Sequence, residues 1–104
     1  QLRWYAWWTT DNVKAVADKY GLDPQHANWL EAFAFTKVSD LPAEIKPCPK
    51  IGTEILGKVK TREVYGDGSF GGHYQVDSEI MEELFSACLE DILELLKFSS
   101  RETQ

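Results

Sequence analysis

The residues best suited to chemistry lie in two short stretches of the sequence. In the first, residues 25–33, His26 is followed five positions later by Glu31, with Trp29 between them. Histidine exchanges protons near neutral pH, and a carboxylate that orients it is a recurrent catalytic device. His26 could therefore act as a general base, orient a substrate or bind a metal. The alternative is a cap or an ordinary surface residue at the start of a helix.

The second stretch is the glycine-rich segment 66–72, Gly-Asp-Gly-Ser-Phe-Gly-Gly, which contains Asp67 and Ser69. It has neither the lysine of a phosphate-binding P-loop nor the glycine spacing of a dinucleotide site. We therefore exclude a nucleotide site. Two interpretations stay open, a structural turn and a loop that shapes a pocket. In the second, Asp67 and Ser69 are candidate substrate-binding residues.

The sequence contains no ligand spacing typical of a metal site. A metal centre made from this chain alone would have to combine His26, His73, Glu31 and Asp67. We predict no metal ligand in this chain, and we interpret His73 as a surface or supporting residue.

The segment that precedes these motifs is rich in aromatic residues. Residues 2–8 predict a buried strand, because they carry no helical period and include Trp4, Trp7 and Trp8. Alternation would put Trp4 and Trp8 on one face and Trp7 on the other. Trp8 ends this strand, and ligands of open α/β sheets bind beyond the carboxyl ends of strands. Trp8 is therefore a candidate wall of a pocket.

Three helices are expected to position these residues. Thr9-Thr10-Asp11 is a helix-start signal, and Gly21 is a natural end. Residues 25–37 predict a second helix, with His26 and Trp29 neighbouring on its outer face. Residues 78–98 predict a long amphipathic helix. Between them we expect a loop at 39–53, a short helix or strand at 54–65 and a glycine turn at 66–75.

The composition and charge of the chain argue against several classes of function. The net charge is −6, with 17 acidic against 11 basic residues, which argues against nucleic-acid binding. No apolar run approaches the ~20 residues of a membrane span. Cys48 and Cys88 are too few and too distant for a metal motif, and Cys88 is interpreted as a small core residue. These features indicate a soluble cytoplasmic protein that binds neither nucleic acid nor membrane.

The two motifs resemble those of the creatininase (creatinine amidohydrolase) family. His26-Ala27-x-x-x-Glu31 is similar to its His-Ala-Gly-x-x-Glu-Thr motif. The resemblance is greater to a branch with His-Ala-Ser-Trp-x-Glu-Asn-Phe followed by Gly-Asp-Gly-Ser-Phe-Gly-Gly. The resemblance extends over nearly all 104 residues, but only to the C-terminal part of a family member.

The resemblance implies a metal-dependent hydrolase of amide bonds, often in rings. Family members hold two divalent metal ions (zinc, manganese or iron), and a metal-bound water attacks the carbonyl carbon. His26 matches the catalytic histidine, which assists proton transfer or holds the substrate, and Glu31 matches the supporting glutamate. Aromatic residues of this half line the family's pocket, which indicates Trp8 and Trp29. Gln25 replaces a glutamate of creatininase itself, so a related amide or lactam is the expected substrate.

The family's metal ligands come from its N-terminal half, and their motifs are not found in this sequence. We therefore expect residues 1–104 to be the C-terminal portion of one α/β domain. That domain would be a three-layer α/β/α fold with a mostly parallel sheet, completed by an N-terminal chain or segment. The Gln1 start favours a processed product or fragment. The expected partners are that N-terminal polypeptide, a small amide substrate and further subunits, as in the family's hexamers. The two metal ions would be bound mainly by the N-terminal polypeptide.

One alternative comes from a different class of protein. The chain could be a small acidic, non-enzymatic binding or inhibitor module. Tryptophans are common anchors at protein interfaces, and the negative charge would suit a basic partner.

Overall fold

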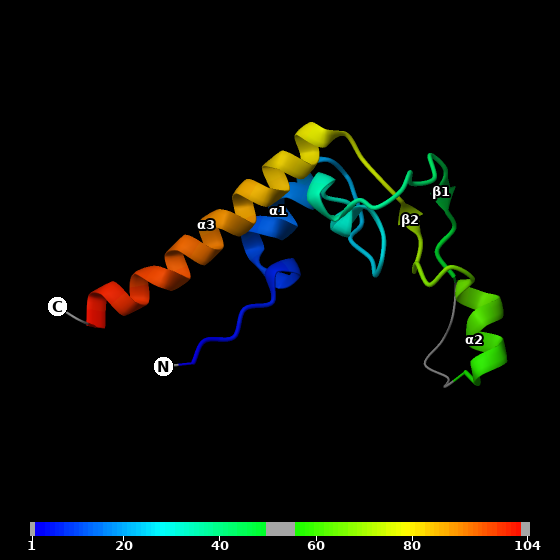
Figure 1. Ribbon diagram of the computed structural model, residues 1–104, viewed down its shortest axis with the longest axis horizontal. Coiled ribbons are helices and arrows are strands. Elements are labelled where there is room, and N and C mark those ends of the chain that lie inside the picture. The colour runs from blue at the N-terminus through cyan, green and yellow to red at the C-terminus, as the bar shows by residue number, and fades with distance from the viewer. Residues whose placement is uncertain (1, 50–55, 103–104) are drawn as a thin grey trace. The chain divides into compact units, whose positions relative to one another are not determined.

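The computed structural model describes residues 2–49 and 56–102, in which helix predominates over strand (Figure 1). The chain divides into two compact units. The first joins the chain up to Leu22 with the helix from Glu79 onward, and the second comprises Asp23–Ser78. The elements are 3-10 turns at Trp7–Thr9, Trp29–Glu31 and Ala34–Thr36, helices α1 (Asp11–Lys19), α2 (Lys58–Tyr65) and α3 (Ser78–Glu102), and strands β1 (Ile45–Lys46) and β2 (Gly72–His73).

The first unit pairs α1 with α3. Thr10 caps α1, because its hydroxyl oxygen accepts the Val13 N–H. The Thr10 hydroxyl also donates to Asp91, and Lys19 forms an ion pair with Glu83, 2.7 Å apart, so the two helices run antiparallel. The buried apolar side chains of this unit are Val13, Val16, Ala17, Met81, Leu84 and Ala87.

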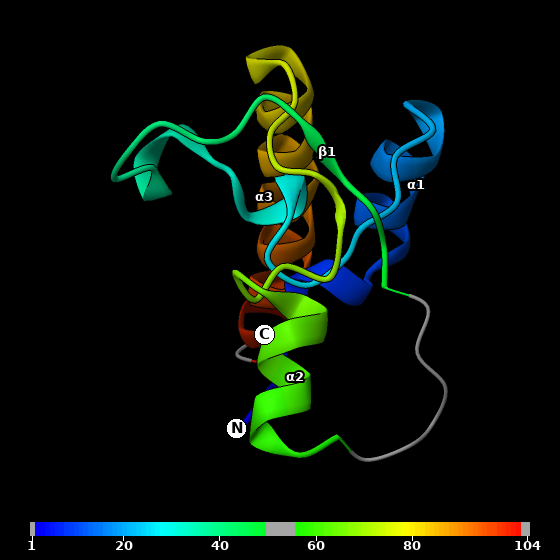
Figure 2. The same cartoon turned by 90° about the vertical axis from the view of Figure 1, so that its right-hand side faces the viewer.

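The second unit is mostly irregular backbone. Strands β1 and β2 pair antiparallel, with Ile45 opposite His73 and Lys46 opposite Gly72. Figure 2 views this unit with α2 toward the reader. Gly66 follows helix α2 and caps its C-terminal end. Its φ of +62° suits glycine, and its N–H donates to the Arg62 carbonyl at 2.8 Å.

The predicted fold class is wrong. The only sheet among the described residues is one antiparallel pair of two-residue strands, and no parallel three-layer α/β/α fold is present there. The predicted strand at residues 2–8 is also wrong. Leu2 and Trp4 are 93% and 89% exposed, and a 3-10 turn occupies Trp7–Thr9. A strand needs a neighbour to pair its backbone groups, and aromatic composition alone does not supply one.

The predicted helix at residues 25–37 is wrong, because the backbone at Ala27 and Asn28 is not right-handed helical. Ala27 has a φ of +53°, a left-handed conformation that a right-handed helix cannot include. The Asn28 side chain then accepts the Leu30 N–H, which starts a short 3-10 turn instead.

The remaining predictions of secondary structure agree with the described residues. The first and last predicted helices are confirmed as α1 and α3. The ambiguity at 54–65 is resolved as helix from Lys58, and residues 54–55 lie outside the described ones. Residues 39–49 form the expected loop apart from β1, and 50–53 lie outside the described residues. In the described part of the chain, no helix has the length and apolar character needed to cross a membrane.

Candidate functional site

The second unit brings the two sequence motifs into contact. The Phe70 N–H donates to the His26 carbonyl at 2.9 Å, and the Asn28 side-chain amide donates to the Gly71 carbonyl at 3.2 Å. Residues more than 40 positions apart in the sequence are thereby joined by one backbone–backbone bond and one side-chain–backbone bond. The candidate site is therefore built from one loop that carries His26 and another that carries Phe70.

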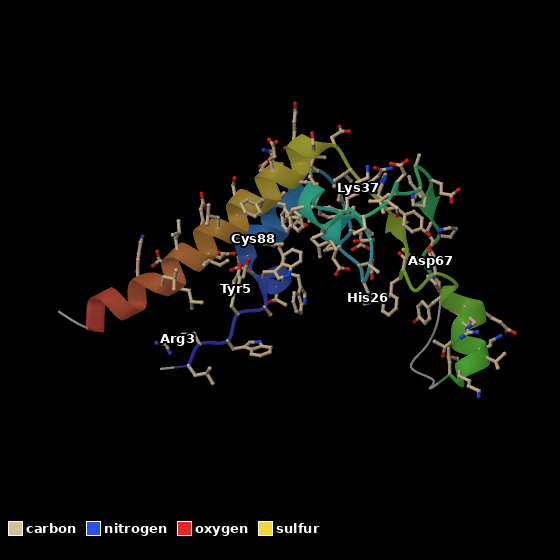
Figure 3. The ribbon with its side chains drawn as sticks, in the orientation of Figure 1. Arg3, Tyr5, His26, Lys37, Asp67 and Cys88 are labelled. Carbon is tan, nitrogen blue, oxygen red and sulfur yellow. The ribbon has the colours of Figure 1, made fainter. Side chains whose placement is uncertain are left out.

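The His26 side chain is exposed at the end of its loop (Figure 3). Its ring centroid is 4.8 Å from that of Phe70, with the planes tilted by 51°. Phe70 in turn stacks on Tyr65, with centroids 4.6 Å apart. Contacts at this distance are favourable for aromatic rings. His26 thus presents an accessible imidazole that contacts the Phe70 ring, and Phe70 itself stacks on Tyr65.

Glu31 bonds to the backbone beside His26. The sequence instead predicted that this carboxylate orients the imidazole ring. One of its carboxylate oxygens accepts the Ala27 N–H at 2.8 Å. This bond holds the strained left-handed Ala27, which directly follows the histidine. Glu31 therefore helps to fix the course of the chain at His26.

Asn28 and Trp29 form the interior of the same loop. Asn28 is 4% exposed and makes three hydrogen bonds, to Asp23, Gly71 and Leu30. Trp29 has no exposed surface, and its indole N–H donates to the Asp23 carbonyl at 3.0 Å. Trp29 organises the loop in this structure, while its predicted role in substrate binding stays a prediction. Sequence reasoning missed Asn28, although an Asn before a short turn is a known capping signal.

An ionic network shapes the glycine-rich loop. The Lys46 ammonium donates to Asp67 and to the Ser69 carbonyl, each at 2.6 Å, and also to the Tyr65 carbonyl. Asp67 further accepts the Tyr74 hydroxyl and the Ser69 N–H. Lys46 was not predicted, because nothing in its sequence neighbourhood distinguishes it from a surface lysine.

These contacts shift the acidity of two groups. The bond from Lys46, followed by those from Tyr74 and Ser69, holds the pKa of Asp67 well below its usual range. The hydrogen bond to Asp67 raises the pKa of Tyr74 to about 12. Asp67 is therefore an ionised side chain whose hydrogen bonds stabilise the loop.

Ser69 and Gly71 are constrained inside the loop. Ser69 is 2% exposed, and its hydroxyl oxygen accepts the Gly71 N–H at 3.2 Å. Gly71 has a φ of +112°, and a Cβ there would lie 2.7 Å from the Cys48 Cα. Only glycine fits this approach. These contacts give Asp67 and Ser69 structural roles, and their predicted contact with substrate stays a prediction.

The described residues contain no group of three or more His, Cys, Asp or Glu side chains able to hold a metal ion. His73 is half-buried in β2. Trp8 belongs to the first unit, where it is 52% exposed and meets Trp7 edge to face at 6.0 Å.

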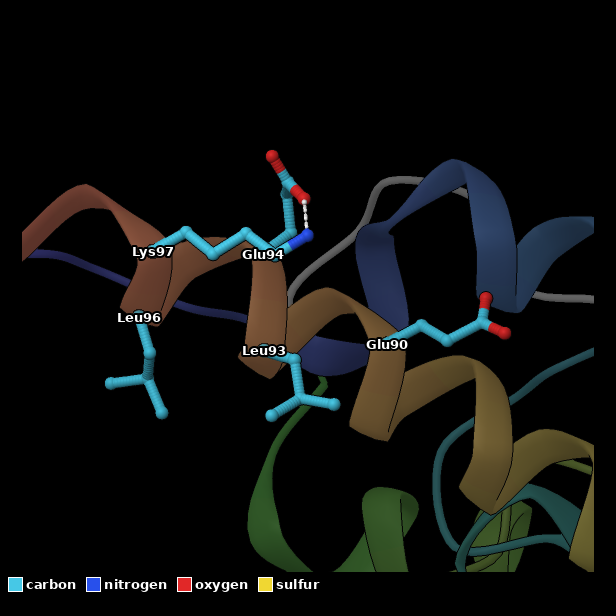
Figure 4. A pocket seen from close by; sticks show the side chains of 5 residues that line it. All are labelled: Glu90, Leu93, Glu94, Leu96 and Lys97. Carbon is cyan, nitrogen blue, oxygen red and sulfur yellow. Dashed lines mark hydrogen bonds and ion pairs between the residues drawn. The ribbon is translucent and has the colours of Figure 1, made fainter. Parts of the chain in front are cut away.

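The first unit carries an apolar stripe along α3. Five of its large apolar side chains are between 39% and 60% exposed: Phe85, Leu89, Ile92, Leu93 and Leu96. A shallow hollow lies beside Leu93 and Leu96, bordered by Glu90 and by the Glu94–Lys97 ion pair (Figure 4). Such a surface suits apolar contact with another molecule and offers no reactive group.

Comparison of the chain with protein-family models, curated proteins and solved structures found no match. The resemblance of the two motifs to the creatininase family therefore stays a prediction from the sequence.

Proposed function

We propose that this chain supplies the histidine-bearing part of a metal-dependent amidohydrolase that resembles creatininase. The reaction is hydrolysis of an amide C–N bond, with a cyclic amide as the favoured substrate class. The observation that carries this proposal is the joining of the two motifs, in which the Phe70 N–H bonds to the His26 carbonyl at 2.9 Å.

The geometry supports a distinct role for each residue of the first motif. His26 has an exposed imidazole, which can accept a proton from an attacking water or donate one to the leaving nitrogen. Glu31 holds the backbone on which His26 stands. In this proposal Asp67 and Ser69 keep the neighbouring loop in shape, and Trp8 is an exposed aromatic residue available to a ligand or partner.

The proposal includes a second polypeptide, equivalent to the N-terminal half of family members, and a larger oligomer. The described residues of this chain do not form a metal cluster, so this partner would hold the two divalent ions. Such ions polarise the substrate carbonyl and lower the pKa of a bound water. A cytoplasmic location is part of the proposal, and the free thiols of Cys48 and Cys88 suit a reducing compartment.

Hydrolysis of amides by the complete assembly tests the proposal. The assay uses linear and cyclic amides with added zinc or manganese. His26→Ala should lower the rate by about 100-fold or more, as expected for loss of a general acid–base group. His73→Ala is the matched control, because the sequence contains two histidines, and it should retain activity with the same assembly. Equal activity of both variants and the parent would contradict the proposal.

A second candidate function is supported by the exposed apolar surface of the first unit. Trp4 is 89% exposed, and the stripe on α3 is accessible. These side chains would suit a binding or inhibitor module without enzymatic activity. In that case Leu93→Glu should abolish binding of a co-purifying protein, while His26→Ala should have no effect. The opposite pattern favours the amidohydrolase.

A further inference from the structure

Phe70 contacts His26 twice. Its backbone N–H donates to the His26 carbonyl, and its ring lies 4.8 Å from the imidazole. The first contact fixes the backbone at His26, whereas the second acts on the side chain. Glu31 supplies the complementary backbone contact through the Ala27 N–H.

The Phe70 ring is itself held in place. Tyr65 stacks on it at 4.6 Å with the planes 28° apart, and Tyr65 ends α2, a regular helix. Phe70 is 40% exposed, so part of the ring stays accessible beside the imidazole. A chain of ring contacts therefore connects the end of α2 to His26: Tyr65 stacks on Phe70, and Phe70 contacts His26.

We infer that Phe70 is a positioning residue, whose ring restricts the imidazole of His26 to one orientation. An exposed histidine side chain otherwise samples several χ1 rotamers. A reacting group that is held in its productive orientation avoids the entropic cost of finding it. The consequence for catalysis rests on the proposed function, but the restriction of the ring does not.

Three-bond couplings from Cγ to the backbone nitrogen and carbonyl carbon of His26 test the inference by NMR in the complete chain. The parent should give the couplings of a single χ1 rotamer. Phe70→Leu should give rotamer-averaged couplings, and Phe70→Tyr should restore the parent values. Phe35→Leu is the matched control, because Phe35 belongs to another ring pair, with Phe33, and is 72% exposed. The Phe70→Leu spectrum must retain the parent's backbone shifts away from residues 26 and 70, which excludes general unfolding, and Phe35→Leu should keep the single-rotamer couplings of His26.

The same variants are then assayed in the assembly. Phe70→Leu should lower kcat by about tenfold with a smaller change in KM, since misorientation affects the reacting geometry more than binding. Single-rotamer couplings in Phe70→Leu would overturn the inference, whatever the activity. Averaged couplings without any loss of hydrolysis would leave the positioning intact and instead contradict the catalytic role of His26.

Discussion

The two units of this protein are stabilised by different interactions. The first contains two regular helices with buried side chains such as Leu84, which is fully buried. The second has short elements, four glycines with positive φ angles among its described residues and a buried side-chain amide, that of Asn28. Its shape depends on hydrogen bonds between a few side chains and backbone groups. The histidine motif lies in the unit whose backbone is less regular, as is usual for functional loops.

The difference implies that single substitutions should act by different mechanisms in the two units. Apolar truncation should matter most in the first unit, and changes in backbone freedom or hydrogen bonding should matter most in the second. Four substitutions test this, beginning with the largest expected effect.

Gly71→Ala should destabilise the second unit most. The new Cβ would approach the Cys48 Cα to 2.7 Å at a φ of +112°. Together, strain and overpacking should cost about 2–5 kcal/mol. Urea unfolding followed by NMR signals of residues 65–74 measures the loss. Gly68→Ala is the control, because its φ is +93° but no atom lies within 4 Å of the added Cβ. Equal losses for both variants would show that the contact with Cys48 is unimportant.

Leu84→Ala should destabilise the first unit by about 3 kcal/mol, since it leaves a cavity at a fully buried position. Hydrogen exchange of α1 and α3 amides measures the change. Leu96→Ala removes a side chain that is 60% exposed and should have a much smaller effect. A comparable effect of the two truncations would contradict a core at Leu84.

Asn28→Ala should cost about 2 kcal/mol, because it removes bonds to the Asp23 and Gly71 carbonyls and the Leu30 N–H inside the second unit. The substitution should also increase exchange of the Phe70 amide, which bonds to His26. Asn12→Ala, at an exposed position in α1, is the comparison. No difference between the two would show that the buried amide does not hold the loops together.

Asp67→Asn should have the smallest effect on stability, because the carboxylate is exposed, but a clear effect on titration. Tyr74 and Tyr5 both have a pKa raised to about 12, Tyr74 by its bond to Asp67 and Tyr5 mainly by burial. The substitution should return only Tyr74 toward the ordinary value of about 10. NMR titration of the two tyrosine rings distinguishes them. A Tyr74 pKa that does not change would exclude Asp67 as the cause.

The hydrogen bonds of Asp67 with Lys46 and Tyr74 also determine how the free energy of unfolding depends on pH. Because the folded pKa of Asp67 is lowered, its stabilisation is present above the ordinary value of about 3.9 and is lost as the pH falls toward the folded pKa. Because the folded pKa of Tyr74 is raised, the contribution of Tyr74 is complete below pH about 10 and is lost as the pH rises through 12. Asp67→Asn should weaken both dependences.

Local sequence signals predicted the elements that depend on local interactions. The Thr10 cap and the apolar period of residues 78–98 identified α1 and α3, and the glycines identified the turn after α2. The helix expected at 25–37 failed because the left-handed Ala27 and the Asn28 bonds involve Glu31 and Gly71. Periodicity carries no information about such contacts. For the same reason Lys46 could not be predicted, since its three acceptors lie about 20 positions away.

Native mass spectrometry of the purified protein, with metal analysis of the same sample, tests the central claim most directly. The proposal predicts a complex between the 11.9 kDa chain and a second polypeptide. It also predicts about two divalent ions per pair, as in two-metal hydrolases. A well-folded, metal-free 11.9 kDa chain alone would contradict the proposal and favour the binding module.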